Sequence, residues 1–287
     1  MQESITSSTK LCAVIGNPVG HSLSPALHNA AFNEKNLDFV YLAFQVEDVK
    51  SALAGMRALK NFRGMSVTIP HKIDAMKYVD EIAEVDRSIG SINTIINEDG
   101  KLIGMGTDGL GALKALVDAG VALDGKSVLM LGAGGAARAI AFTLARNAKL
   151  GKLTLLDINE PFLKGLAADL QSGTDACIES EVLNDKSLVH AMAHADVIIN
   201  CTPIGMHPRE GVSLVPVELF RPGQVVFDVV YTPLETKLLA DARSRGLLTV
   251  SGVEMFINQA VLQFEAFTGV DAPIDVMRNI VMEKLKL

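Results

Sequence analysis

The residues that most limit which reactions this chain could catalyse form a glycine turn. It runs from Gly132 to Ala137 with the sequence Gly-Ala-Gly-Gly-Ala-Ala. Gly132 permits a tight turn after a strand, Gly134 lets a pyrophosphate approach the backbone, and Ala137 lets the following helix pack closely. The N-terminus of that helix offers N–H groups and a partial positive charge to phosphates. The pattern predicts dinucleotide binding. The alternative is an α/β turn that binds nothing, or only a phosphate.

Asp157 directs the choice of cofactor, because it follows the next apolar stretch, Leu153 to Leu156. A carboxylate at the end of the second strand accepts hydrogen bonds from the adenosine ribose and repels a 2′-phosphate, which an Arg nearby would bind. Residues 158–162 contain neither Arg nor Lys. We therefore predict NAD, with NADP less favoured; Asp157 as a plain helix N-cap is the alternative. The predicted cofactor-binding residues are Gly132, Ala133, Gly134, Gly135, Ala136, Asp157, Thr202 and Gly252.

Lys72 is the best candidate for proton transfer, because a nicotinamide enzyme acting on an alcohol needs a base for the hydroxyl proton. It follows a strand end in a loop stiffened by Pro70, where sites are often built. Burial can lower the pKa of a lysine toward neutrality, and a carboxylate can then hold its ammonium form in place. Asp108 is a plausible partner. Taken singly, Lys72 also fits a surface lysine and Asp108 a helix N-cap, and spacing alone does not show that they meet.

Ser22 and Ser24 place two hydroxyls at a turn before a helix, which suits an acidic substrate group such as a carboxylate. Ordinary helix capping by Ser24, with Pro25 at the first helical position, is the alternative.

The sequence shows no evident set of metal-binding residues. His190 and His194 have i, i+4 spacing, but they lie far from the glycine turn and are interpreted as a solvated helix face.

Apolar stretches alternate with helical patterns, which predicts an α/β protein of two domains. The Asp-Gly at 99–100 indicates a hairpin turn in the first of them. In the first part of the chain we expect strands at 11–15, 39–46, 65–69, 91–96 and 101–103 and helices at 24–35 and 49–59. Further on we expect a helix at 108–119, parallel strands at 128–131, 153–156, 197–200, 225–228 and 247–250 in a doubly wound sheet, and closing helices at 254–267 and 274–286.

The closing helices need a surface on which to pack, and the first domain is one candidate. We therefore expect a substrate-binding domain of residues 1–108 plus 253–287 and a Rossmann-type dinucleotide-binding domain of residues 109–252, with the active site in the cleft between them.

The composition excludes several other classes of protein. The chain has 287 residues, a net charge of −7 and no basic block, so nucleic acid is not an expected partner. No apolar run approaches the roughly 18 residues of a membrane span, and the polar start is unlike a signal peptide. Three scattered cysteines indicate a reducing cytoplasm rather than disulfides or zinc.

The chain resembles the shikimate/quinate dehydrogenases over nearly its whole length. The resemblance rests on several motifs in order: Ser22-Leu-Ser-Pro25, Val67-Thr-Ile-Pro-His-Lys72, Ile92-Asn-Thr94, Thr107-Asp-Gly109, Gly132 to Ala139, Asp228-Val-Val-Tyr-Thr-Pro233 and Asn258-Gln-Ala260.

This resemblance implies hydride transfer between a nicotinamide and the C3 hydroxyl of shikimate, quinate or a related cyclic hydroxy acid, in a monomer or homodimer. It implies that Lys72 and Asp108 are catalytic, and that Ser22 and Ser24 hold the substrate carboxylate. The other implied substrate contacts are Thr68, Asn93, Gln259 and Tyr231, the first three to the ring hydroxyls.

Ser66 and Gly106 depart from the family pattern, since each stands where an Asn is typical. Losing two amides beside the pocket would remove hydrogen bonds or open space, so the substrate could be a different one, such as an aminated analogue. A non-catalytic NAD-sensing protein is a further alternative, which the retention of Lys72 and Asp108 disfavours.

Overall fold

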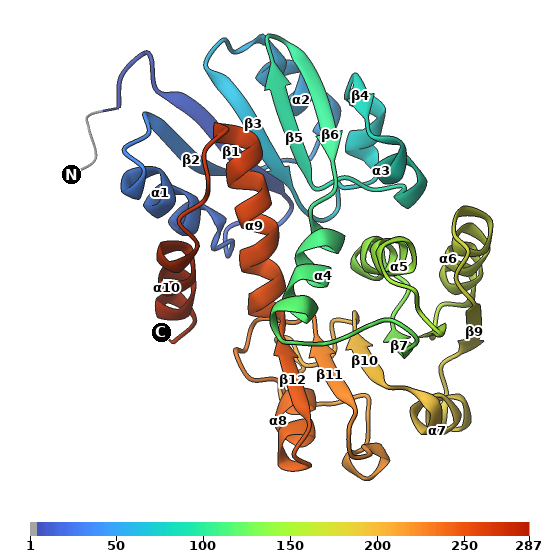
Figure 1. Cartoon of the computed structure of the whole chain (residues 1–287). Coiled ribbons are helices and arrows are strands. Elements are labelled where there is room, and N and C mark those ends of the chain that lie inside the picture. Colours follow the sequence, from blue (N-terminus) through green and yellow to red (C-terminus); the bar gives the residue numbers. More distant parts are fainter. Residues whose placement is uncertain (1–4, 287) are drawn as a thin grey trace. The chain divides into compact units, whose positions relative to one another are not determined.

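The chain forms two compact units in a computed structural model that describes residues 5–286 (Figure 1). The first unit combines the residues up to Thr107 with those from Gln259 onward, and the second is Asp108–Asn258. One boundary falls at the first residue of α4 (Asp108–Asp118) and the other falls inside α9 (Gly252–Thr268). The predicted α/β class is confirmed, and no helix of the described residues is long and apolar enough to cross a membrane.

The first unit is built on a mixed sheet in the order β2-β1-β3-β5-β6-β4. β1, β2 and β3 are parallel, whereas β5 runs antiparallel to both β3 and β6. Its strands are β1 (Lys10–Gly16), β2 (Phe39–Gln45), β3 (Phe62–Val67), β4 (Glu81–Ile82), β5 (Thr94–Glu98) and β6 (Lys101–Met105). Its helices are α1 (Ser24–Glu34), α2 (Val49–Ala58), η1 (Asp74–Tyr78), α3 (Glu84–Ile89), α10 (Ile274–Leu285) and the part of α9 from Gln259 onward.

The predicted hairpin joins β5 to β6 through Asp99 and Gly100. Both residues have positive φ, 52° and 94°, as a two-residue turn between twisted strands requires. Asn97 fixes the turn, because its Oδ1 accepts from the backbone N–H of Gly100 at 2.7 Å.

α10 and the part of α9 from Gln259 onward belong to the first unit. α10 packs against α1, and Phe264 and Phe267 of α9 are fully buried. Arg63 of β3 donates from Nε to the carbonyl of Phe267 at 2.8 Å and from Nη1 to that of Asn97 at 3.0 Å, which ties the end of α9 to the sheet.

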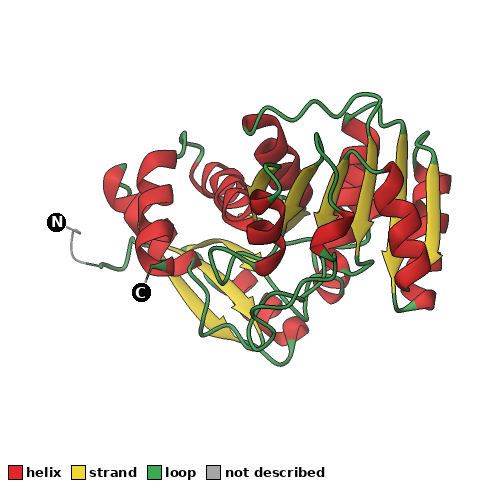
Figure 2. Ribbon diagram, turned by 90° about the horizontal axis from the view of Figure 1, so that it is seen from below, coloured by secondary structure: helices red, strands yellow, loops and turns green. Residues whose placement is uncertain are grey.

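The second unit is a doubly wound sheet of parallel strands in the order β12-β11-β10-β7-β8-β9, with helices on both of its faces (Figure 2). The strands are β7 (Ser127–Leu131), β8 (Lys152–Asp157), β9 (Ile178–Val182), β10 (Val197–Asn200), β11 (Val225–Asp228) and β12 (Leu248–Ser251). The helices are α4, α5 (Gly135–Asn147), α6 (Glu160–Gly173), α7 (Asp185–His194), η2 (Val217–Leu219), α8 (Lys237–Ser244) and the start of α9.

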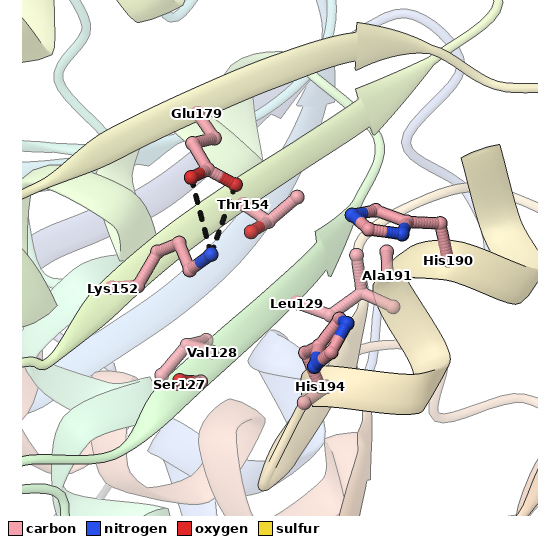
Figure 3. A pocket seen from close by; sticks show the side chains of 10 residues that line it. Ser127, Val128, Leu129, Lys152, Thr154, Glu179, His190, Ala191 and His194 are labelled. Carbon is pink, nitrogen blue, oxygen red and sulfur yellow. Dashed lines mark hydrogen bonds and ion pairs between the residues drawn. The ribbon is translucent and has the colours of Figure 1, made fainter.

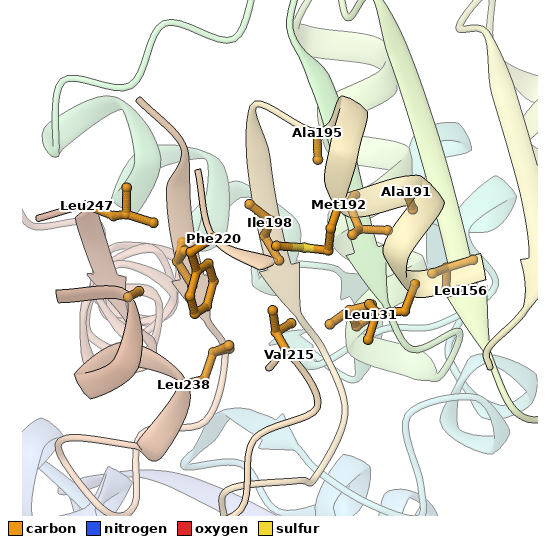
Figure 4. Close-up of a cluster of buried hydrophobic side chains, with 14 of the residues drawn as sticks. Leu131, Leu156, Ala191, Met192, Ala195, Ile198, Val215, Phe220, Leu238 and Leu247 are labelled. Carbon is orange, nitrogen blue, oxygen red and sulfur yellow. The ribbon is translucent and has the colours of Figure 1, made fainter. Parts of the chain in front are cut away.

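The buried strands of this sheet read as continuous apolar runs because helices cover both faces. One core cluster joins Leu129 and Leu131 of β7 to Met192 of α7 and Leu238 of α8, around Ile198 of β10 (Figure 4). β9 was not predicted. It is the edge strand, four of its five residues are exposed, and its sequence Ile-Glu-Ser-Glu-Val carries charge on the solvent side.

Candidate active site

The glycine turn connects β7 to α5 in the second unit. Gly132 has φ +104°, and a Cβ on it would lie 3.1 Å from the carbonyl carbon of Cys201, so the position requires glycine. A Cβ on Gly134 or Gly135 would meet nothing within 4 Å, which leaves their backbone open to a ligand. The N-terminal N–H groups of α5 begin there, so the geometry fits a pyrophosphate.

Asp157 braces this turn from the end of β8. One carboxylate oxygen accepts from the backbone N–H of Ala133 and the other from that of Asn159, both at 2.6 Å. Asn159, not Asp157, is the N-cap of α6, where its side chain accepts from the N–H of Phe162. Both oxygens of Asp157 are thus hydrogen-bonded to backbone.

A buried carboxylate organises the loops that follow β10 and β11. Asp228 is fully buried and accepts from Asn200 Nδ2 (2.9 Å), the backbone N–H of Val230 (3.1 Å) and Thr236 Oγ1 (2.6 Å). Asn200 in turn accepts from the N–H and hydroxyl of Thr202, a predicted cofactor contact. Burial raises the pKa of Asp228 above its usual value. In the sequence Asp228 stands out only as part of the motif from Asp228 to Pro233, and its position at the end of a strand is the signal that could have found it.

Tyr231 and Gly252 lie in the same unit, beyond β11 and at the start of α9. The Tyr231 ring stacks on Phe256 with 5.0 Å between the ring centroids, and burial raises the pKa of its hydroxyl. A Cβ on Gly252 would lie 2.3 Å from the carbonyl oxygen of Val229, so this glycine permits a close approach of two backbones.

In the first unit the structure brings Asn93 and Gln259 together around Thr107. The Asn93 Oδ1 accepts from the backbone N–H of Thr107 at 2.7 Å, and its Nδ2 donates to Thr107 Oγ1 at 2.9 Å. Thr107 Oγ1 lies 3.4 Å from Gln259 Oε1. Two amides predicted to bind substrate hydroxyls are therefore held by one threonine, although they are far apart in the sequence.

The loop from Thr68 to Lys72 leaves the end of β3. The backbone N–H of Thr68 donates to Ile15 and that of His71 to Thr68, while the ring of His71 bonds to the carbonyl of Val46 at 2.7 Å. Lys72 itself is half-buried, and its carbonyl accepts from Ile92. Lys72 belongs to the first unit and Asp108 begins the second, so their pairing stays a prediction.

Ser22 and Ser24 lie at the start of α1. The alternative interpretation, in which Ser24 caps this helix, is wrong: Ser24 is already its first residue, Leu23 is the N-cap, and no side chain caps there. Instead, the backbone N–H of Ser24 donates to Ser22 Oγ at 3.3 Å. The two hydroxyls are thus neighbours on one turn.

Gly106 is one of the two positions that depart from the family pattern. The side chain of Asp86 occupies the space beside it. A Cβ at this position would lie 2.7 Å from Oδ1 of the buried Asp86. The expectation that the missing amide opens space is therefore not met there, because a carboxylate of α3 stands beside the glycine.

A separate pocket of the second unit contains none of the predicted site residues (Figure 3). It lies at the amino ends of the strands, near Ser127 and Lys152, where Lys152 Nζ pairs with Glu179 at 3.1 Å. The exposed His190 and His194 of α7 line it with rings 5.1 Å apart. Ligands of open parallel sheets bind at the opposite, carboxyl ends, so we assign this pocket no role in the reaction.

Comparison with known proteins identifies the kind of site. The profile of the shikimate dehydrogenase substrate binding domain matches residues 14–95, and that of the shikimate 5′-dehydrogenase C-terminal domain matches residues 252–282. Residues 128–209 match the saccharopine dehydrogenase NADP binding domain. The shikimate dehydrogenase (NADP(+)) of Moorella thermoacetica is 44% identical over 98% of this chain and 95% of its own.

Solved structures agree with the sequence relatives. A shikimate dehydrogenase in complex with NADP+ has a TM-score of 0.90 at 40% identity and covers 99% of both chains. Shikimate 5-dehydrogenase from Listeria monocytogenes, in complex with shikimate and NAD, has a TM-score of 0.92 at 36% identity and covers 98% of this chain and 99% of its own.

The prediction that NAD is preferred over NADP is wrong. Relatives from Moorella, Bacillus and Methanocaldococcus are named as NADP(+) enzymes, and a similar structure holds NADP+. The prediction treated Asp157 as a group that faces the ribose, whereas its two oxygens bind the N–H groups of Ala133 and Asn159. With motifs, domains and relatives in agreement, the chain belongs to the shikimate dehydrogenase family of oxidoreductases.

Proposed function

We propose that this protein is an NADP-dependent shikimate dehydrogenase, which interconverts 3-dehydroshikimate and shikimate. The observation that carries the proposal is the 44% identity to the Moorella enzyme of that name over 98% of the chain. The bound nicotinamide would supply or accept the hydride. Residues 109–252 would hold it, with the glycine turn at the pyrophosphate and Gly132 to Ala136, Thr202 and Gly252 beside it.

Residues 1–108 and 253–287 would hold the substrate and carry the proton chemistry. Lys72 would donate a proton to the C3 oxygen as the ketone is reduced, and accept it back in the oxidation. Asp108 would stabilise the ammonium form of Lys72. A lysine suits this step because its ammonium group points a proton at an oxygen without needing a metal.

The remaining residues would orient the ring. Ser22 and Ser24, neighbours on one turn, would donate to the substrate carboxylate. Thr68, Asn93 and Gln259 would bind the ring hydroxyls, and the stacked ring of Tyr231 would line the pocket. The Thr107 contacts of Asn93 and Gln259 support this assignment, since a shared anchor fixes both amides before a substrate arrives.

The test is steady-state turnover followed by the absorbance of the reduced nicotinamide. Shikimate and quinate are each supplied with NADP and with NAD. We expect the highest kcat/KM for shikimate with NADP. The absence of turnover of shikimate with either cofactor would refute the proposal, and faster turnover of quinate would replace the substrate.

A further inference from the structure

Phe256, near the start of α9, packs flat against the ring of Tyr231. The ring centroids are 5.0 Å apart and the two ring planes are inclined by 19°, which is a stacked arrangement. Aromatic pairs contribute more than their buried area alone, because their quadrupoles favour particular orientations. Both residues belong to the second unit and both are half-buried, so the stack holds the Tyr231 ring in one plane.

The loop that carries Tyr231 is fixed where it leaves β11. The backbone N–H of Val229 donates to the carbonyl of Asn200 at 3.0 Å, and that of Val230 donates to Asp228 Oδ1 at 3.1 Å. The chain therefore leaves the strand in a set direction. Tyr231 follows at the carboxyl end of β11, and the carboxyl ends of the strands are where open parallel sheets bind their ligands.

The first turn of α9 brings Phe256 to this loop. A Cβ on Gly252 would lie 2.3 Å from the carbonyl oxygen of Val229, so the helix begins in close contact with the loop only because residue 252 is glycine. Phe256 is four residues further along, and positions i and i+4 of a helix share one face. The face of α9 that meets the loop at Gly252 therefore presents Phe256 to Tyr231.

The hydroxyl of Tyr231 is available to a ligand. It makes no hydrogen bond to any of residues 5–286. Burial raises its pKa, so the hydroxyl keeps its proton at neutral pH and can donate it to an acceptor oxygen. A half-buried donor of this kind gains a hydrogen bond when a ligand with an acceptor fills the space in front of it. Because the stack on Phe256 sets the plane of the ring, it also sets where this O–H lies.

We propose that Phe256 is a positioning residue, which holds the ring of Tyr231 so that the Tyr231 hydroxyl donates a hydrogen bond to an oxygen of the substrate. This inference rests on the proposed function, in which Tyr231 lines the substrate pocket. It makes the aromatic ring at position 256, and not only its apolar bulk, a determinant of specificity. A substrate with an acceptor oxygen at this point gains the hydrogen bond, and an analogue without that oxygen does not.

The experiment is a double-mutant cycle of Tyr231→Phe and Phe256→Leu in the full-length protein. Tyr231→Phe removes the hydroxyl and keeps the ring, so KM for shikimate should rise about tenfold, the worth of one hydrogen bond. Phe256→Leu removes the stack and keeps apolar bulk, so KM should rise about threefold. In the Tyr231→Phe background, Phe256→Leu should add less than about 1.5-fold, because the hydroxyl that it positions is gone. In every variant kcat and KM for NADP should change by less than about twofold.

Two further variants separate positioning from loss of stability. Phe256→Tyr keeps the ring and should keep KM for shikimate within about 1.5-fold of the wild type; a KM as high as that of Phe256→Leu would overturn the inference. Phe220→Leu is the matched control, because Phe220 lies in the core of the same unit and precedes β11, whereas Tyr231 follows it. It should lower the melting temperature and leave KM unchanged. If the wild type turns over shikimate but Phe256→Leu raises KM equally with and without the Tyr231 hydroxyl, or not at all, the inference is wrong and the proposed function stands.

A second readout does not depend on turnover. The chain has three tyrosines and no tryptophan, so an NMR spectrum of the protein with ¹³C-labelled tyrosine rings contains few signals. Those lost in Tyr231→Phe belong to Tyr231. They should shift in Phe256→Leu, because the ring current of Phe256 is removed, and stay in place in Phe220→Leu. Unmoved Tyr231 signals in Phe256→Leu would overturn the inference, whether or not the wild type is active.

Discussion

Replacing Asp228 tests how the loops beside the glycine turn are held. In Asp228→Ala three buried donors lose their acceptor: Asn200 Nδ2, the backbone N–H of Val230 and Thr236 Oγ1. In Asp228→Asn the remaining oxygen can still accept from Asn200 and Val230, and the Thr236 hydroxyl can turn to accept from the new amide. The two variants thus separate the hydrogen bonds of Asp228 from its charge.

The magnitudes follow from the buried groups. An unsatisfied buried donor costs about 1 kcal/mol or more, so Asp228→Ala should lower the free energy of unfolding by about 3 kcal/mol. For a unit of this size that corresponds to a loss of roughly 6–12 °C in melting temperature. Asp228→Asn should be as stable as the wild type or more so at neutral pH, because it removes a carboxylate whose ionised form is disfavoured by burial.

The sign of the pH dependence follows from the raised pKa of Asp228. The folded state binds the proton more tightly than the unfolded chain, so the contribution of this group to stability is fully present below the ordinary pKa of 3.8 and is lost as pH rises through the folded value. Asn does not titrate. The advantage of Asp228→Asn over the wild type should therefore grow as pH rises from acid to neutral.

Thermal and urea unfolding across this pH range measure both effects. Asp118→Asn is the control, because Asp118 lies exposed on α4 in an ion pair with Lys114 and should change stability by less than about 0.5 kcal/mol. If Asp228→Asn is as unstable as Asp228→Ala, the negative charge itself is required and the reasoning from burial is refuted.

The other predictions concern the reaction and the cofactor. Lys72→Ala should lower kcat at least about 10²-fold, the usual range for a general acid–base group, and an unchanged kcat in steady-state assays would remove its assignment. Gly132→Ala should weaken NADP binding and lower stability by about 1 kcal/mol or more, because φ is +104° there; calorimetric titration and unfolding measure the two effects. Asp157→Ala should raise KM for NADP about tenfold, because the backbone N–H of Ala133 loses its acceptor and the glycine turn is no longer braced. A KM equal to that of the wild type would contradict this role.

Local sequence rules predicted the elements that depend on buried apolar runs. β7, β10 and β11 were found within a residue of their bounds, because strands covered on both faces carry unbroken apolar runs. The Asp-Gly hairpin was found because only a few residue types tolerate its positive φ. β9 was missed because an exposed, charged edge strand has no such run, and Ser24 was misassigned because the helix begins one residue earlier than the serine preference for N-caps suggests, so that Leu23 is the N-cap.

The candidate site was only partly predictable, because its contacts link residues far apart in the chain. Glycine spacing indicated the turn at Gly132, since that turn is a local piece of backbone. The hydrogen bond between Ser66 and Gln263 joins residues 197 positions apart, and no spacing rule reports it. For Asp157 the residue type suggested a contact with the ribose, but its carboxylate accepts from the backbone of Ala133 and Asn159, and these partners are set by the fold.

The position of the unit boundary inside α9 has a consequence for synthesis on the ribosome. The second unit is one uninterrupted stretch, so its sheet can close as soon as residue 258 has emerged. The first unit must wait, because Phe264, Phe267 and α10, which complete its core, are made after the whole of the second unit. The unit that is begun first is thus completed after the second, and its exposed core is what a chaperone would meet on the nascent chain.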